Sequence, residues 1–217
     1  LDRPDPNGFY FDGNIADTAY RSFVGLDPVP VVHGMTVGEY ARMLNGEGWL
    51  KGGIKCDLTV IKCKNYTHNT LYELPVKPSP NLPNQTSVYL YPSLCFFEGT
   101  NISVGRGTGF PFQVYGSPKL PETGFSFTPA SFPGATDPQF LGQKCFGKDL
   151  RNAMKDKIVP APGINLEWLI EAYRNYPEKD KFFNSYFDTL ASGPGLREQI
   201  VKGMSAGQIR ASWKEGL

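Results

Sequence analysis

The sequence predicts a mixed α/β fold that becomes helical in its last third. Thr36 begins a run with helical spacing, β-branched and aromatic residues dominate 57–63 and 87–97, and amphipathic helical spacing returns after Asn165. The chain has 217 residues, of which 40% are hydrophobic and 13% aromatic. A chain of this size and composition can bury a substantial core.

The residue pattern of the first third predicts one helix and one strand. The opening LDRPDPNG reads as a loop that leaves the end of a strand. Thr36 and Glu39 then have the spacing of a capping box and predict the start of a helix that ends near Asn45. The β-branched segment 57–63 predicts a strand, and the proline-rich segment 74–84 predicts an extended loop.

The middle of the chain predicts a second strand and then irregular structure. The run SVYLYPSLCFF, residues 87–97, predicts a strand that would carry Glu98 at its carboxyl end. Ligands of open α/β sheets gather at that end. Prolines and phenylalanines dominate 111–138, which predicts an irregular region with short strands.

The last third predicts several short helices. Asn165 can cap a helix, and a similar apolar stripe continues through 183–190. Pro194 suits a first helical turn. Ser205 and Gln208 have capping-box spacing before the final helix.

Composition and motifs exclude several functional classes. The net charge of +1 gives no long-range attraction for nucleic acid, and no apolar run has the length of a membrane span. The four cysteines lack a CxxC pair and there are two histidines, which argues against a metal site. One disulfide and four reduced thiols both remain open. Nucleotide-phosphate and serine-hydrolase motifs are missing, so no cofactor is predicted.

The segment EGTNISVGRGT, residues 98–108, is the first candidate for a functional site. Glu98 is placed as a general acid, and Arg106 lies between Gly105 and Gly107, where a guanidinium can recognise a carboxylate. The alternative is that Glu98 and Arg106 pair with each other and close the loop.

Four other residues are weaker candidates. His33 precedes the capped helix and could donate to a ligand hydroxyl or merely orient the turn. Asp2 and Arg3 lie where a strand is expected to end, but a pair that fixes a proline turn is an equal alternative. Asn81 has an amide suited to sugar hydroxyls and equally to an ordinary turn.

Several long motifs occur in a fixed order: DRPDPNG, PVPVVHGMTVGEYARMLNGE, PSPNLPN, YPSLCFFEGTNISVGRGT and PFQVYGSP. In this respect the sequence resembles the DUF1343 family, the exo-β-N-acetylmuramidases of the NamZ type. The resemblance is carried by motifs from Asp2 to about Gly116 and continues more weakly to Trp213. It implies a Rossmann-like domain followed by a smaller α+β domain with terminal helices.

That resemblance places residues 1–87 in the latter part of the Rossmann-like domain, whose first half is missing, and residues 88–217 in the C-terminal domain. It implies a glycosidase of the cell envelope, periplasmic or secreted, that releases N-acetylmuramic acid from the non-reducing end of peptidoglycan fragments. The implied partners are a muropeptide and the N-terminal half of the same protein, with no nucleic acid. The alternative is a non-catalytic carbohydrate-binding or wall-associated module.

The resemblance also suggests roles for individual residues. Glu98 is expected to be one catalytic carboxyl, with a second one upstream of this chain. Arg106 is expected to bind the lactyl carboxylate of muramic acid. Supporting contacts with the sugar are expected from His33, Asp2, Asn81 and Asn101, with Arg3 beside them.

Overall fold

The computed structural model describes residues 1–153 and 162–217 and shows two small antiparallel sheets among helices. Strands β1 (Asp12–Ile15) and β2 (Pro30–Val32) form one sheet. Strands β3 (Val114–Ser117), β5 (Cys145–Asp149) and β4 (Ser126–Phe127) form the other in that order. The predicted mixed α/β class is confirmed.

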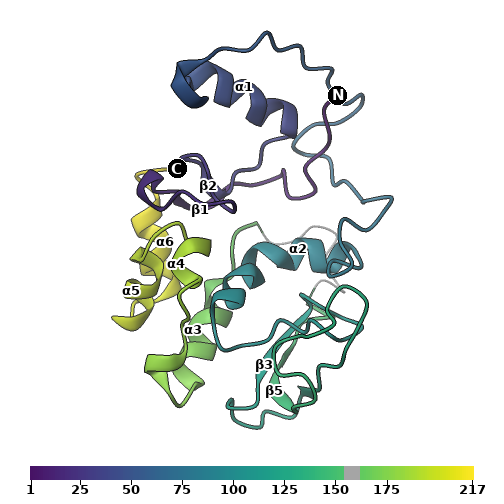
Figure 1. Cartoon of the computed structure of the whole chain (residues 1–217), viewed down its shortest axis with the longest axis vertical. Coiled ribbons are helices and arrows are strands. Elements are labelled where there is room, and N and C mark those ends of the chain that lie inside the picture. Colours follow the sequence, from purple (N-terminus) through teal and green to yellow (C-terminus); the bar gives the residue numbers. More distant parts are fainter. Residues whose placement is uncertain (154–161) are drawn as a thin grey trace.

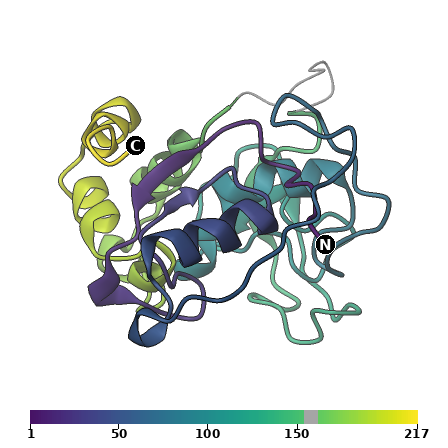
Figure 2. The ribbon, with the colours of Figure 1, turned by 90° about the horizontal axis from the view of Figure 1, so that it is seen from above.

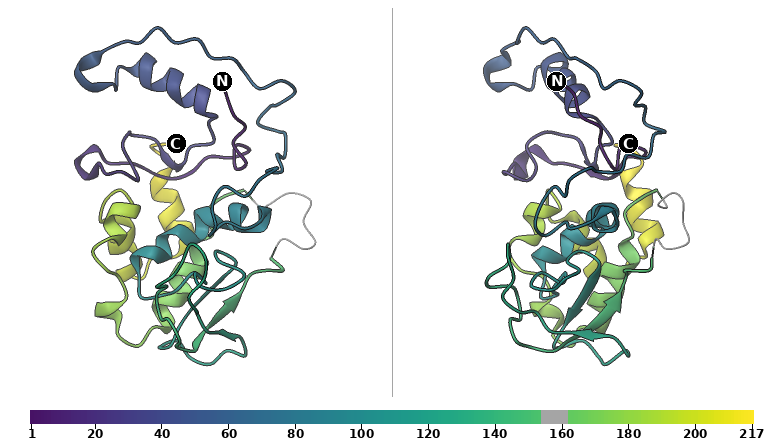
Figure 3. Two further views of the ribbon diagram at one scale, coloured as in Figure 1. Left: turned by 45° about the vertical axis from the view of Figure 1, so that its right-hand side comes forward. Right: turned by 90° about the vertical axis from the view of Figure 1, so that its right-hand side faces the viewer.

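The two sheets lie in different parts of an elongated molecule. Helices α1 (Val37–Glu47) and α2 (Gln85–Leu94) are followed by α3 (Leu166–Asn175), α4 (Phe187–Leu190), α5 (Gly195–Val201) and α6 (Ala206–Trp213). Short 3₁₀ turns are η1 (Thr18–Tyr20), η2 (Lys51–Gly53), η3 (Cys95–Gly99) and η4 (Lys179–Lys181). Helix α1 lies at one end and the three-stranded sheet at the other, with α2 and the C-terminal helices between them (Figures 1 and 3).

Helix α1 begins at the predicted capping box. The Thr36 hydroxyl accepts from the Glu39 N–H at 3.2 Å, and a Glu39 carboxylate oxygen accepts from the Thr36 N–H at 2.9 Å. Gly48, at φ 73°, ends the helix in the left-handed conformation. Seen from above, α1 lies over the pair formed by β1 and β2 (Figure 2).

The prediction of a strand at 57–63 is wrong. This segment runs beside α1 without a strand partner, and Asp2 donates its N–H to the Ile61 carbonyl at 2.9 Å. Its β-branched residues suit a pleated strand, but a strand also requires a neighbour with which to form a ladder. The proline-rich segment 74–84 is an extended loop, as predicted.

The strand predicted at 87–97 is also wrong, because these residues form α2 and η3. The Asn84 side chain accepts from the Ser87 N–H at 3.0 Å and caps α2. Pro92 removes the N–H that would bond the Val88 carbonyl four residues earlier. The Asn7 side chain donates to that carbonyl instead, at 3.1 Å. A contact distant in sequence therefore offsets the helix-breaking residue.

Most of the remaining helices and strands agree with those predicted from the sequence. β3 and β4 are the short strands expected within 111–138. The Asn165 cap of α3 and the capping box of Ser205 and Gln208 at α6 are confirmed. The apolar stripe of 183–190 is not one helix, because only Phe187–Leu190 is helical. All four cysteines are free, and within residues 1–153 and 162–217 no helix has the length and apolar character of a membrane span.

The core has one large cluster between α2, η3 and the C-terminal helices, and a small second cluster of Val114, Phe127 and Cys145 in the three-stranded sheet. Its largest fully buried side chains include Phe96, Phe97, Phe182 and Phe187, together with the inner face of α3. Gly99 lies directly against Phe187, since a Cβ on this glycine would be 2.4 Å from the Phe187 Cα. The close approach of η3 to α4 therefore requires glycine.

Candidate functional site

Asp5 is held by its own turn at the N-terminal end of the chain. It lies between two prolines, and its carboxylate accepts from the Asn7 N–H at 2.8 Å. Its carbonyl accepts from the Tyr66 hydroxyl at 3.1 Å and from the Gly8 N–H at 3.0 Å. Burial raises the pKa of the Asp5 carboxyl, and the Asn7 hydrogen bond and the charge of His33 only partly offset this effect.

His33 follows β2 directly and faces the same region. The Met35 N–H donates to its Nδ1 at 3.0 Å, so the neutral ring carries its proton on Nε2. Burial lowers the pKa of His33, against the opposing effect of Asp5. His33 is therefore held as a neutral side chain whose Nε2–H has no partner among residues 1–153 and 162–217.

Asp5 and His33 line one cavity of about 320 Å³ between the N-terminal segment, β2 and α2. Its walls are Asp5, Asn7, Val31, Val32, His33, Tyr91, Pro92 and Cys95. A cavity of this size admits a small ligand. Burial raises the pKa of the Cys95 thiol to about 12. The thiol therefore keeps its proton, and Cys95 lines the cavity without acting as a nucleophile.

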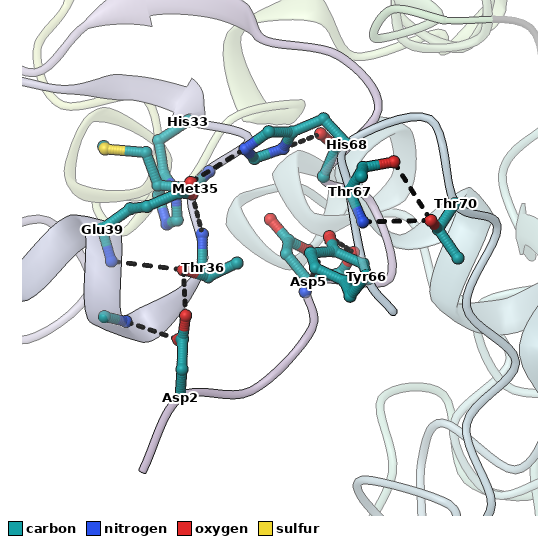
Figure 4. Close-up of polar contacts among 12 residues, drawn as sticks. Asp2, Asp5, His33, Met35, Thr36, Glu39, Tyr66, Thr67, His68 and Thr70 are labelled. Atoms are coloured by element: carbon teal, nitrogen blue, oxygen red, sulfur yellow. Dashed lines mark hydrogen bonds and ion pairs between the residues drawn. The ribbon is translucent and has the colours of Figure 1, made fainter. Parts of the chain in front are cut away.

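A network of polar contacts supports this region from the α1 side (Figure 4). His68 lies between the Gly8 carbonyl, 2.7 Å from Nδ1, and the Glu39 carboxylate, 3.1 Å from Nε2. Both neighbours are acceptors, so the ring satisfies both when it is protonated. The Gly8 hydrogen bond and then the Glu39 contact raise the pKa of His68.

Glu98 and Arg106 pair with each other. The Glu98 Oε1 accepts from Arg106 Nε at 2.9 Å and from Nη2 at 2.6 Å, which is the loop-closing alternative. Arg106 also lies over the Phe112 ring, 5.1 Å from its centroid. Glu98 belongs to η3, so its predicted position at a strand end is wrong. The pair is next to the cavity but outside its walls, since the Glu98 charge acts on both Tyr91 and Cys95.

The glycines on either side of Arg106 serve the packing of the loop. Gly105 and Gly107 have φ values of 78° and 80°. A Cβ on Gly107 would be 2.5 Å from the Ala130 carbonyl oxygen. The loop therefore packs its glycines against the protein itself.

Asp2 and Arg3 organise the start of α1. The buried Asp2 carboxylate accepts from the Thr36 hydroxyl at 2.9 Å and from the Gly38 N–H at 2.7 Å. Burial acts to raise the pKa of Asp2, but these hydrogen bonds outweigh it and lower that pKa. Arg3 donates to the Asp2 carbonyl at 2.7 Å, so the turn-fixing alternative describes this pair.

Asn81 and Asn101 connect loops. The Asn81 amide donates to the Gly134 carbonyl at 2.9 Å, and the Asn101 amide donates to the Lys181 carbonyl at 2.5 Å. Neither residue lines the cavity with His33. Of the residues predicted from the sequence, the structure therefore brings His33 into the cavity and Glu98 and Arg106 beside it, and places the others elsewhere.

Sequence reasoning missed Asp5, Asn7 and Tyr91. The signal for Asp5 was a carboxylate between two prolines, whose rigid backbone fixes the direction of the side chain. Tyr91 was not predicted, because 87–97 was expected to be a strand. A strand directs its side chains differently from the helix that these residues form.

Two family models together match most of the chain. The model of the family described as exo-β-N-acetylmuramidase NamZ, N-terminal, matches residues 1–86, and that of its C-terminal counterpart matches residues 89–217. A curated relative is the peptidoglycan β-N-acetylmuramidase NamZ of Bacillus subtilis strain 168. It is 38% identical over 235 residues, which cover 100% of this chain and 55% of the relative.

Two solved structures have the same fold. One DUF1343 family protein of Bacteroides fragilis NCTC 9343 is 52% identical with a TM-score of 0.95, and covers 99% of this chain. A second DUF1343 protein of that organism is 22% identical with a TM-score of 0.77 and the same coverage, and shows the fold alone. The chain spans 61% of each of these proteins.

Proposed function

The chain belongs to the NamZ family, also called DUF1343, and from that premise we propose that it is part of a glycosidase that acts on peptidoglycan. The proposed reaction is release of N-acetylmuramic acid from the non-reducing end of glycan fragments. We assign residues 1–87 to the latter part of a Rossmann-like domain and 88–217 to a smaller C-terminal domain. The substrate would place the protein in the cell envelope, periplasmic or secreted.

The observation that supports this proposal best is the cavity that contains Asp5 and His33. A partly buried carboxyl with a raised pKa stays protonated nearer to neutral pH and can protonate a leaving glycosidic oxygen. We therefore assign Asp5 as the general acid, in place of the Glu98 predicted from the sequence.

His33 has a complementary role. Its neutral ring presents the Nε2 proton, which suits a hydrogen bond to a hydroxyl or an acetamide oxygen of the sugar. Its lowered pKa keeps positive charge away from the carboxyl that must donate a proton. We assign His33 to positioning the sugar and not to proton transfer.

Glycoside hydrolysis requires a second participant besides the acid. Within the described part of the chain, Asp5 is the carboxyl that lines this cavity. The second participant is then the 2-acetamido group of the substrate or a carboxyl from the additional sequence that the longer relatives carry. Arg106 keeps the predicted role in recognising the lactyl carboxylate, for which it must exchange its pairing with Glu98.

Kinetics on a chromogenic N-acetylmuramide test these assignments. The assay uses this chain alone and also joined to the additional sequence of the longer relatives. We expect Asp5→Asn to lower kcat by about 100-fold or more, because the variant cannot donate the proton. Glu98→Gln is the matched comparison and should retain most of kcat, since Glu98 lies outside the cavity.

The opposite result would assign the acid role to Glu98. Binding of muropeptides without turnover by both forms of the protein would instead support the carbohydrate-binding alternative. Mass analysis of the products separates release of free N-acetylmuramic acid from cleavage within the glycan.

A further inference from the structure

A second cavity lies between strand β5, helix α3 and the loop that follows β3. Its volume is about 260 Å³, and it shares no wall with the cavity of Asp5 and His33. The residues that matter for its chemistry are Tyr115, Leu120, Phe125, Lys148, Glu171 and Asn175. The proposed glycosidase reaction uses none of them.

Tyr115 has an unused hydroxyl in this cavity. The residue is only 3% exposed, and its ring stacks on Phe97 with the centroids 4.8 Å apart. No residue that the structure describes forms a hydrogen bond with its hydroxyl. Burial, with a contribution from the Glu171 charge, raises the pKa of Tyr115, so the hydroxyl keeps its proton. The hydroxyl oxygen of this protonated tyrosine can accept a hydrogen bond from a ligand in the cavity.

Opposite charges lie side by side in the wall of this cavity. Lys148 on β5 and Glu171 on α3 are 2.6 Å apart and are each about half exposed. Leu120 and Phe125 contribute apolar surface to the wall of the same cavity. An ion pair between side chains this exposed contributes little to stability, so a ligand can replace each half of it.

The other carboxylate that lines this cavity, that of Asp149, is already paired with a cation. Asp149 accepts hydrogen bonds from the Arg151 side chain, the shortest at 2.6 Å from Nη2, and from the Arg151 N–H at 3.0 Å, and these lower the pKa of this carboxyl. Glu171 on α3 is then the carboxylate that faces a ligand from the helix side of the cavity. The cavity therefore favours a cation near α3 and an anion near Lys148.

We propose that this cavity binds a zwitterionic amino acid or short peptide that has an apolar side chain. The ligand ammonium lies between Glu171 and the Tyr115 hydroxyl, and its carboxylate pairs with Lys148. The apolar side chain packs on Leu120 and Phe125. A neutral sugar would leave both charges unused.

Isothermal titration calorimetry of the 217-residue chain with L-alanyl-L-leucine tests the proposal. A ligand of this size should bind with a Kd of about 1 mM or tighter. N-acetylation removes the ammonium and amidation removes the carboxylate. Each change should weaken binding about tenfold or more, because hydrogen bonds to charged groups are the stronger ones.

Variants separate a binding site from a structural role. Tyr115→Phe removes only the hydroxyl and should weaken binding without lowering Tm, since no described residue uses that hydroxyl. Glu171→Gln should also weaken binding. Glu178→Gln is the matched control, because Glu178 pairs with Lys119 at 2.7 Å outside this cavity. Absence of binding to the dipeptide, or equal binding by Tyr115→Phe, Glu171→Gln and the unchanged chain, would overturn the proposal. Calorimetry does not depend on glycosidase turnover, so failure of one proposal leaves the other intact.

Discussion

Asn7 links the N-terminal segment to helix α2 at the carbonyl that Pro92 leaves free. Its amide donates to the Val88 carbonyl at 3.1 Å, across 81 residues of sequence. Asn7 also donates its N–H to the Asp5 carboxylate. The same residue therefore orients the proposed acid and supplies the hydrogen bond that Pro92 cannot give to the Val88 carbonyl.

Asn7→Ala should lower the free energy of unfolding by about 1–2 kcal/mol, because the Val88 carbonyl loses its partner. Urea denaturation followed by circular dichroism measures the change. Asn69→Ala is the control, since Asn69 is exposed and should shift stability by less than about 0.5 kcal/mol. Equal effects of the two substitutions would contradict this account of α2.

At this scale the sequence predicted contacts between neighbours but not those between distant segments. The capping pair of Thr36 and Glu39 was predictable, because both partners lie within one helical turn. The raised pKa of Asp5 was not, because it arises from burial by residues far away in sequence.

At the scale of elements, the start of α1 is held by side chains from two other segments. Asp2 bonds the Gly38 N–H, and His68 connects Glu39 to the Gly8 carbonyl. The pKa of His68 is higher in the folded protein than its ordinary value of about 6.5. Its stabilising contribution is therefore fully present below about pH 6.5 and is lost as the pH rises through the raised pKa.

This contribution can be measured by urea denaturation at intervals between about pH 5 and pH 9, a range that spans ordinary and raised histidine pKa values. The unchanged protein should lose stability as the pH rises through the upper part of that range. His68→Gln should lose less over the same range. Parallel pH curves for the two proteins would show that His68 does not titrate as described.

Helix α2 shows why some elements were not predictable. Its β-branched and aromatic residues, with Pro92, favour a strand by local pattern. The observed helix depends on the Asn84 cap and on burial of Val88, Leu90 and Leu94 in the core. Capped helices with exposed outer faces, such as α3 and α6, were predictable because their local and tertiary preferences agree.

At the scale of the whole molecule, the first strand and the last helix are joined by charge. Arg210 on α6 pairs with the buried Asp12 of β1 and donates to the Ile164 carbonyl at 2.5 Å. Asp12 also accepts from the Ile164 N–H at 2.7 Å. Three segments distant in sequence meet at one carboxylate.

Arg210→Met should destabilise the fold by about 1–3 kcal/mol, because the buried Asp12 carboxylate loses its cation and keeps only the Ile164 N–H. Lys202→Met is the control, since the Lys202–Glu198 pair is exposed and 3.9 Å apart. Thermal denaturation should show a large drop in Tm for the first substitution and little change for the second. A small drop for both would mean that the pairing with Asp12 adds little to stability.

The pairing of Asp12 with Arg210 also sets an order of events during synthesis. The two residues are 198 positions apart. At about 5–20 residues per second, translation places about 10–40 seconds between them. During that interval the Asp12 carboxylate of the nascent β1 has not yet met its cation, because Arg210 of α6 has not been synthesised.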